Sequence, residues 1–299
     1  MSEAIGGYVH DGATVALEGF THLIPFAAGH EIIRQGRRGL TLVRMTPDII
    51  ADQLVAAGAV EKMIFAFTGN SSVGSLYAIR RAVEQAEPRP LHLEEYSHYG
   101  LLARYQAGAA DIPFMPVRSY AGSDLPEVNT NLRKVANPYA DDLETFVVPP
   151  IQPDVTIVHA QRADRYGNIQ AWGILGPQQE AAFAARHVVA VVEEIVDDDI
   201  IRRDPNRTTI PGFAVDAVVE CPRGTHPSFA QGYYDRDNTF YRGWSAISKD
   251  PAALQQWLHD WVYTVENHQD YLRKLGDSHF NDLIPHPHLS EPVNYGSTR

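Results

Sequence analysis

The 299-residue sequence contains one cysteine, Cys221, so no disulfide bond can form within the chain. The CxxC and HExxH spacings that hold metal ions in many proteins are also absent. Residues 1–11 have neither the basic start nor the apolar core of a signal peptide. These absences predict a protein of the reducing cytoplasm that holds no metal ion.

Positive charge is scarce as well. The chain has 25 Lys and Arg residues against 37 Asp and Glu residues, and its formal net charge is −12. Its basic residues occur in pairs at most, so the sequence lacks the clustered basic face that nucleic acids require. It also lacks an apolar run long enough to span a membrane. We therefore expect neither nucleic acid nor a membrane as a partner.

Strands and helices alternate in the first part of the chain, which is long and apolar enough to bury a large core. Strands are expected at residues 13–18, 40–44 and 62–67, and helices at residues 25–35 and 47–57. This alternation predicts the α/β class, with a mainly parallel open sheet and helices on both of its faces.

The alternation stops at residues 129–150, an irregular segment with three prolines, and then resumes. Strands are expected at residues 155–159, 187–192 and 217–220, and a short helix at residues 181–186. The sheet therefore continues past the interruption.

The C-terminal part reads differently. Residues 222–240 are loop-like, and apolar residues at helical spacing predict one helix over residues 252–275. The tail after Gly276 contains three prolines and is expected to be extended. We predict one domain over residues 1–250, with the helix and tail of residues 251–299 packed on it.

A cluster of polar, titratable residues ends an alternating apolar and polar stretch at residues 94–99. Open α/β sheets bind ligands at the carboxyl ends of their strands, so this cluster is the first candidate site. Glu94 and Glu95 are neighbours on an expected strand and face opposite ways, so at most one points into a pocket. Glu95 is the candidate catalytic carboxylate, and its alternative role is an ordinary surface ion pair.

Tyr99 is the second catalytic candidate, because a phenol can donate a hydrogen bond to a carbonyl or carboxylate group. Its alternative role is packing. Ser97 and His98 are not interpreted as a nucleophile and its base, since neighbours in a strand point apart and no orienting acid is identifiable. Ser97, Tyr99 and Gly100, which begins a helix-like run, remain candidates for binding a substrate.

Other polar residues are assigned structural roles. Asp164 and Asn168 flank Gly167 in a pattern typical of a tight turn. His22 is isolated and is interpreted as a satisfied surface or core residue. The histidines at positions 279, 286 and 288 lie in the proline-rich tail and are interpreted as solvent-exposed, so they do not predict a metal site.

Four segments in this order resemble the α subunit of family I CoA-transferases, the glutaconate and 3-oxoacid type. Residues 11–20 followed by Pro25 resemble the family's opening strand, Gly-Gly-Phe loop and helix, although Glu18 replaces the first glycine. Residues 39–43 resemble its second strand. The remaining two are a Gly-initiated helix with its small-residue stop, residues 100–113, and an Asp-x-x-Gly-Asn turn, residues 164–168.

The resemblance implies that CoA moves between carboxylic acids by way of a glutamyl-CoA thioester on the enzyme. It places the nucleophilic glutamate in a Ser-Glu-Asn-Gly type motif of a β subunit, and this chain has no such motif. The implied partner is that β subunit, in a heterodimer or an α2β2 heterotetramer. CoA and acyl-CoA are substrates, and no tightly bound cofactor is expected.

In that case the chain supplies pocket walls and hydrogen-bond donors. The backbone N–H groups of Gly19, Phe20, Gly69 and Asn70 lie in loops after expected strands and are candidate oxyanion donors. A capping serine explains residues 69–72 equally well. The resemblance places a glutamine amide at the position of Tyr99 in 3-oxoacid transferases.

Two alternatives stay open. The first is the α subunit of a hydrolase of the same fold that opens a ring in an acyl-CoA, where related enzymes place a glutamate near Tyr99. The second is a ligand-sensing or assembly module without catalytic activity. An in-chain base would favour the hydrolase, and a preceding DNA-binding segment would favour the module.

Overall fold

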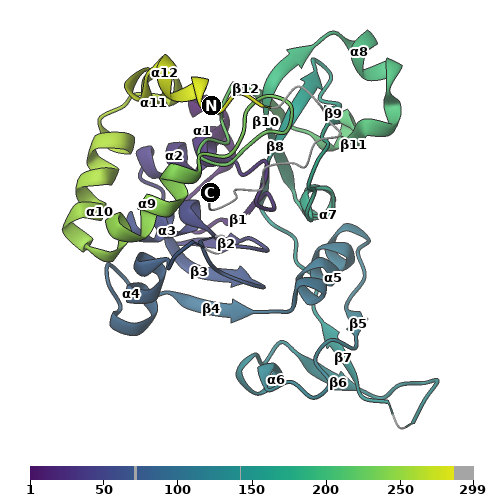
Figure 1. The fold of residues 1–299 in the computed structure, drawn as a ribbon. Helices are drawn as coiled ribbons and strands as arrows, with labels where there is room; N and C mark the ends of the chain where they lie inside the picture. The colour runs from purple at the N-terminus through teal and green to yellow at the C-terminus, as the bar shows by residue number, and fades with distance from the viewer. Residues whose placement is uncertain (71–72, 142, 286–299) are drawn as a thin grey trace.

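The computed structural model describes residues 1–70, 73–141 and 143–285, which form one large and one small sheet (Figure 1). The large sheet has nine strands within these residues, and its parallel run has the spatial order β4-β3-β2-β1-β8-β10-β12. This arrangement confirms the predicted α/β class and mainly parallel sheet. The strands of the run are β1 (Thr14–Glu18), β2 (Leu40–Val43), β3 (Val60–Phe65), β4 (His92–Glu95), β8 (Val155–Asp164), β10 (His187–Val196) and β12 (Ala217–Glu220).

The predicted turn at residues 164–168 joins β8 to the short antiparallel strand β9 (Ile169–Gln170). Asp164 Oδ1 accepts hydrogen bonds of 2.9 Å from the backbone N–H groups of Tyr166 and Asn168. Gly167 has a φ of 84°, a conformation that side-chain-bearing residues rarely adopt. The turn is therefore confirmed, and a further antiparallel strand, β11 (Thr208–Ile210), pairs with β9.

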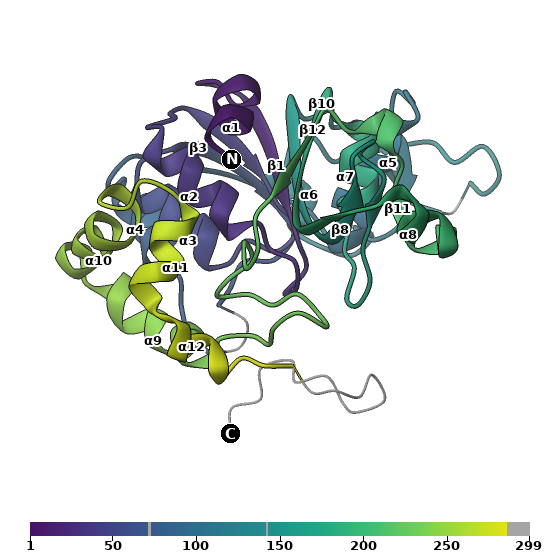
Figure 2. The same cartoon turned by 90° about the horizontal axis from the view of Figure 1, so that it is seen from above.

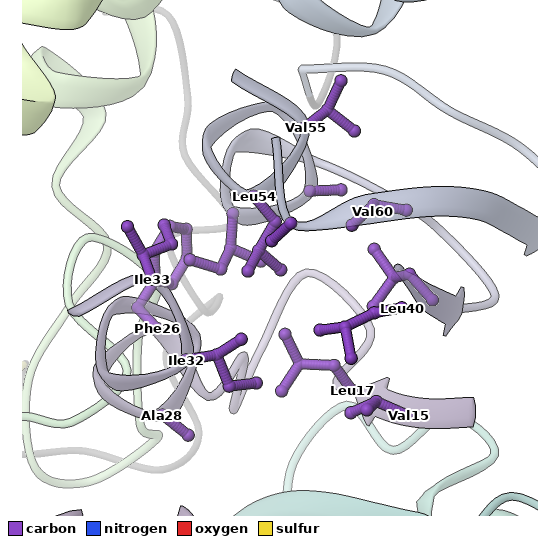
Figure 3. Packing of buried hydrophobic residues seen from close by; sticks show 14 of the residues in the cluster. Val15, Leu17, Phe26, Ala28, Ile32, Ile33, Leu40, Leu54, Val55 and Val60 are labelled. Carbon is purple, nitrogen blue, oxygen red and sulfur yellow. The ribbon is translucent and has the colours of Figure 1, made fainter. Parts of the chain in front are cut away.

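The two faces of the sheet are covered by different helices (Figure 2). Side chains alternate along a strand, so Val15 and Leu17 of β1 face one way and Ala16 the other. Val15 and Leu17 pack in the cluster that holds α2 (Phe26–Arg34) and α3 (Ile49–Ala56), shown in Figure 3. Ala16 packs in the cluster that holds α5 (His98–Ala109) and α7 (Gln178–Ala184).

The segment predicted to be irregular, residues 129–150, is partly regular. It supplies two strands, β6 (Arg133–Val135) and β7 (Thr145–Val148), of a small antiparallel sheet whose order is β5-β7-β6. The third strand, β5 (Met115–Val117), follows α5, and a single turn, α6 (Leu125–Val128), precedes β6. The prolines of this segment lie outside its strands, so they do not interrupt the ladder.

The single helix predicted for residues 252–275 is wrong. The chain forms α10 (Pro251–Leu258), a π-helical turn (His259–Tyr263) and, after a break, α11 (His268–Leu275). The break lies where Asn267 caps α11 by accepting from the Asp270 N–H. The tail after Gly276 is also not simply extended, because α12 (Asp277–Asn281) is helical, while residues 286–299 lie outside the described residues.

Several helices were not predicted from the sequence, namely α1 (Ser2–Tyr8), α4 (Tyr77–Gln85), α8 (Asp198–Arg203) and α9 (Asn238–Lys249). As for membrane spans, none of the helices in the described residues is long and apolar enough to cross a bilayer.

Asp52, a buried residue of α3, joins three helices by hydrogen bonds. Its Oδ1 accepts from the Ile79 N–H of α4 at 2.9 Å, and its Oδ2 accepts from Trp244 Nε1 of α9, also at 2.9 Å. The hydroxyl of Ser248, in the last turn of α9, donates to the same Oδ2. One carboxylate therefore attaches the C-terminal helices to the first half of the sheet.

Replacing Asp52 by Ala should destabilise the protein by about 3 kcal/mol or more, because three buried donors lose their acceptor. Glu84→Ala is the matched control, since the Glu84 carboxylate makes only an exposed ion pair with Arg80 and should cost about 1 kcal/mol or less. Urea denaturation of both variants measures the difference. Equal losses would contradict the role assigned to Asp52.

Candidate active site at the carboxyl edge of the sheet

The carboxyl ends of β1 to β4 meet at one edge of the large sheet (Figure 1). The Phe67 N–H donates to Met45 O at 3.2 Å, which ties the segments after β3 and β2 together. The rings of Phe20, after β1, and His98, at the start of α5, lie with their centroids 6.1 Å apart. The edge therefore brings the loop after β1 next to the first turn of α5.

The loop after β1 has a strained backbone. Thr21 and Leu23 have φ values of 58° and 53°, in the left-handed region that non-glycine residues avoid. The loop is held by the Leu23 N–H, which donates to Phe229 O at 3.0 Å, and by the Ser228 hydroxyl, which donates to Thr21 O at 3.0 Å. Such conformations cost roughly 1–3 kcal/mol each and gather at functional sites.

Gly19 is required by the loop itself. A Cβ atom at this position would lie 2.5 Å from Leu23 O, so any side chain would collide with the loop's own backbone. From the sequence, the backbone N–H groups of Gly19 and Phe20 were predicted to approach a ligand. The glycine has a structural reason here, and the role of these two N–H groups as oxyanion donors stays a prediction.

His22 is buried in the same loop and is satisfied at both ring nitrogens. Its Nδ1 lies 2.9 Å from Ile174 O, and its Nε2 accepts from the Gln231 N–H at 2.9 Å. Burial lowers the pKa of His22 to about 4, so the ring is neutral. The interpretation of His22 as a satisfied residue is confirmed.

Glu18, the residue that replaces a glycine of the family signature, is fully buried beneath the loop. Its carboxyl group accepts from the Met45 N–H at 3.0 Å and from the Tyr105 hydroxyl of α5 at 2.8 Å. Burial raises the pKa of Glu18 to about 7, although Arg44 and the hydrogen bonds oppose this. The side chain points into the protein, so it does not fill the space beside the loop.

Arg44 is the buried cation of this region. Its guanidinium donates to Leu17 O at 2.5 Å and to Gly19 O at 3.0 Å, and it lies 3.4 Å from the Asp48 carboxylate. The sequence analysis missed both Arg44 and Tyr105. A charged residue directly after an apolar strand was the signal for Arg44, whereas nothing in its spacing distinguishes Tyr105 from a core tyrosine.

Ser97 and Gly100 shape the start of α5. Ser97 Oγ caps the helix by accepting from the Gly100 N–H at 3.0 Å, and it lies 3.0 Å from Ser119 Oγ. A Cβ atom on Gly100 would lie 1.6 Å from the Tyr120 hydroxyl, so this glycine is required by packing. His98 packs near Phe20, and no bond joins it to Ser97 within the described residues, in agreement with the rejected nucleophile and base pair.

Glu94 and Glu95 face opposite sides, as predicted. The Glu94 carboxylate is buried and accepts from Arg104 and from the Tyr96 hydroxyl, both at 2.6 Å, and it pairs with Lys62. Burial raises its pKa, but these partners outweigh that effect and lower it overall. Glu95 is exposed, and its carboxylate makes no ion pair or side-chain hydrogen bond within the described residues. Its catalytic role stays a prediction.

Tyr99 is 52% exposed on the first turn of α5. Its hydroxyl forms no hydrogen bond to any described residue, and its ring lines a cavity toward the small sheet. An exposed phenol without an internal partner is available to a substrate, so the binding role predicted for Tyr99 fits its position.

The Gly69 N–H and the side-chain amide of Asn70 donate within the chain, and the role of the Asn70 N–H as an oxyanion donor stays a prediction. The Gly69 N–H donates to Pro47 O at 3.1 Å, and the buried Asn70 side chain donates from Nδ2 to Tyr241 O at 2.8 Å. In this conformation the Gly69 N–H is not available to an oxyanion, and Asn70 holds α9. Ser71 and Ser72, the proposed capping alternative, lie outside the described residues.

His226, Asp237 and His279 form a cluster whose spacing would suit a metal ion. Both His226 Nε2, at 3.2 Å, and His279 Nε2, at 2.8 Å, lie within hydrogen-bonding distance of Asp237 Oδ2. Two N–H donors on one carboxylate satisfy the cluster with protons alone, and the hydrogen bond from His226 helps to lower the Asp237 pKa to about 2 against the effect of burial. The expected absence of a metal stays a prediction, and the other tail histidines, 286 and 288, lie outside the described residues.

Comparison with known proteins gives consistent results. Residues 1–221 match the family model described as coenzyme A transferase. The chain is 47% identical to the A subunit of the 3-oxoadipate CoA-transferase of Pseudomonas knackmussii over 277 residues, which is 93% of this chain and 97% of the relative. It is 36% identical to the A subunit of the glutaconate CoA-transferase of Acidaminococcus fermentans, covering 98% of this chain and 96% of the relative.

The crystal structure of the Acidaminococcus fermentans glutaconate enzyme superimposes with a TM-score of 0.89, 35% identity and coverage of 96% of this chain and 95% of that chain. A more distant relative is the cholesterol ring-cleaving hydrolase IpdA subunit of Rhodococcus jostii, 29% identical and covering 91% of this chain and 93% of the relative. The chain belongs to the coenzyme A transferase family. The resemblance to family I α subunits is thereby confirmed.

Replacing Gly100 by Ala should destabilise the protein by about 1–3 kcal/mol, because the new methyl group displaces the buried Tyr120 hydroxyl. That hydroxyl also accepts from the Ser97 N–H, so the start of α5 should loosen. Gly243→Ala, in an exposed position of α9 with no atom within 4 Å of the added carbon, is the control and should gain about 0.5–1 kcal/mol. Thermal melting compares them, and a neutral Gly100→Ala would contradict the packing argument.

Glu18 should make stability depend on pH. Its folded pKa of about 7 lies above the unfolded value of 4.5, so the folded chain keeps a proton that the unfolded chain loses between these values. Its contribution is therefore complete below pH 4.5 and falls by about 3 kcal/mol as the pH rises through 7. Glu18→Gln removes this dependence.

Urea denaturation of wild type and Glu18→Gln between pH 5 and 8 measures the effect, and their difference in unfolding free energy should shift steadily in favour of the variant as the pH rises. Glu95→Gln is the control, because its carboxylate faces water in the folded and unfolded chains alike. A pH-independent difference for Glu18→Gln would show that Glu18 is already ionised at pH 5.

Proposed function

We propose that this chain is the α subunit of a two-subunit CoA-transferase that moves CoA between carboxylic acids. The observation that carries the proposal is the 47% identity to the corresponding subunit of a 3-oxoadipate CoA-transferase over almost the whole of both chains. The fold agrees, since the chain superimposes on glutaconate CoA-transferase over nearly its full length.

The catalytic nucleophile is assigned to the β subunit. Four carboxylates of this chain lie at or just after the carboxyl ends of β1, β2 and β4, and none of the four is placed to attack an acyl-CoA. Glu18 is buried and bonded to Tyr105, Glu94 is buried in ion pairs with Arg104 and Lys62, and Asp48 is buried beside Arg44. Glu95 alone among these is exposed, and no described residue bonds to its carboxylate or orients it.

The proposed chemistry proceeds through covalent intermediates on the partner's glutamate. Its carboxylate attacks the acyl-CoA carbonyl, and the CoA thiolate leaves as an acyl-glutamyl anhydride forms. The thiolate then attacks the glutamyl carbonyl, releasing the first acid and leaving a glutamyl-CoA thioester. A second acid reverses these steps, so the energy of the thioester bond is conserved.

The role of this chain is to build the wall against which the reacting group lies. The strained loop after β1 and the first turn of α5 meet there, and the exposed side chains of Tyr99 and Phe67 border it. Phe67, two residues after β3, is 56% exposed.

Further details follow from the same proposal. Both similar relatives are named for dicarboxylic acids, 3-oxoadipate and glutaconate, so a dicarboxylic acyl group is the proposed substrate class. The assembly is a heterodimer or an α2β2 heterotetramer, without a tightly bound cofactor. We place the enzyme in the cytoplasm, and we keep the division of the chain at residue 250 as a proposal.

The hydrolase alternative rests on the more distant ring-cleaving relative. It requires a base in this chain, and position 99 holds a tyrosine rather than a carboxylate. The transferase is therefore the better-supported function, and a module without activity has no specific observation in its favour.

The isolated chain should transfer no CoA, whereas co-expression with its β subunit should restore ping-pong transfer between two acids. Hydroxylamine treatment of the complex with acyl-CoA should modify a glutamate of the β subunit, which mass spectrometry locates. The same complex without acyl-CoA is the control. Full transfer activity of the isolated chain, or an adduct on Glu95, would contradict the assignment of the nucleophile.

A further inference from the structure

A cavity of about 810 Å³ lies between the first turn of α5 and the small sheet. Its volume is in the range of small-molecule sites. Its walls are mainly apolar and come from three places along the chain: Tyr99 of α5, Phe114 and Val117 around β5, and Val135 and Leu143 around β6 and β7.

Arg118, directly after β5, is the single charged residue among the described residues that line this cavity. Its guanidinium makes no ion pair and no hydrogen bond within the described residues. Arg118 is exposed, so its guanidinium is accessible to a ligand, whereas the buried Arg104 and Arg44 pair with Glu94 and Asp48. A guanidinium at the wall of an apolar cavity favours an anionic ligand, and its planar fork fits a carboxylate.

The cavity adjoins the candidate active site. Ser119, the neighbour of Arg118, has its hydroxyl oxygen 3.0 Å from that of Ser97, the cap of α5. His98, one residue further on, packs beside Phe20 of the loop after β1. Tyr99, on the same turn of α5, lines the cavity together with Arg118, so the cavity begins beside the edge of the sheet.

We infer that Arg118 binds the remote carboxylate of a dicarboxylic acyl group and so determines which acids the enzyme accepts. The inference rests on the proposed function and adds the residue that selects the substrate. The apolar walls of the cavity contact the carbon atoms between the two carboxyl groups of the substrate. The Tyr99 hydroxyl is a second hydrogen-bond donor at the entrance of the cavity. The reacting carboxyl group stays at the edge of the sheet.

The test compares two acceptors of equal length in the assembled complex, with succinyl-CoA, whose acyl group carries a remote carboxylate, as the common donor. 3-Oxoadipate has a remote carboxylate, and 3-oxohexanoate has a methyl group in its place. Arg118→Ala should lower kcat/KM for 3-oxoadipate about 10- to 100-fold and change that for 3-oxohexanoate by less than about threefold. Arg118→Lys should fall between wild type and Arg118→Ala, because it keeps the charge but loses the fork.

Arg80→Ala, which removes an exposed arginine from α4, is the control and should leave both acids unaffected. An equal loss for both acids would overturn the inference, and so would loss of the β subunit during purification of Arg118→Ala, which would assign the cavity to the subunit interface. A wild-type complex that transfers CoA to neither acid would refute the proposed function and, with it, this inference.

Discussion

The candidate site depends on one buried cation, Arg44, at the carboxyl ends of β1 and β2. A buried guanidinium needs partners for its donors, and Arg44 donates to the carbonyls of Leu17 and Gly19 and pairs with the Asp48 carboxylate, while its Nε has no partner among the described residues. Those two carbonyls must face inward, which fixes the direction in which the chain leaves β1. Glu18 and Tyr105 complete the network and connect the loop to α5. Because this hydrogen-bond network fixes the start of the loop, Thr21 and Leu23 keep their left-handed backbone conformations.

Most of the parallel sheet could be predicted because its strands correspond to apolar runs that are separated in the sequence by helices and glycines. The run at β10, buried over most of its length, is an example. The small sheet could not be predicted in the same way, since β5 and β6 are three residues long and β6 is exposed throughout, so no periodicity develops over so few residues. The break before α11 was missed because apolar residues resume at Tyr271 and Leu272, which hid the polar residues 266–270 and the local cap that Asn267 provides.

The site was predicted in position more than in detail. The stretch from Glu94 to Gly100 does lie at the carboxyl edge, because the end of a strand is visible in sequence. The roles of the individual residues at the site could not be predicted from the sequence. Gly19 and Gly100 looked like places for a ligand, yet both are required by close contacts with Leu23 and Tyr120, which only the fold brings near. Arg118 was overlooked, since its lack of a partner is a property of three-dimensional neighbours.

The central claim is that the carboxyl edge of this chain forms one wall of an active site whose nucleophile belongs to a partner. A crystal structure of the assembled complex with a trapped acyl-CoA intermediate tests it most directly. The account predicts that CoA or the acyl group is bonded to a glutamate of the β subunit, with the reacting carbonyl beside Phe20 and the first turn of α5. An intermediate bonded to this chain, or bound away from that edge, would contradict it.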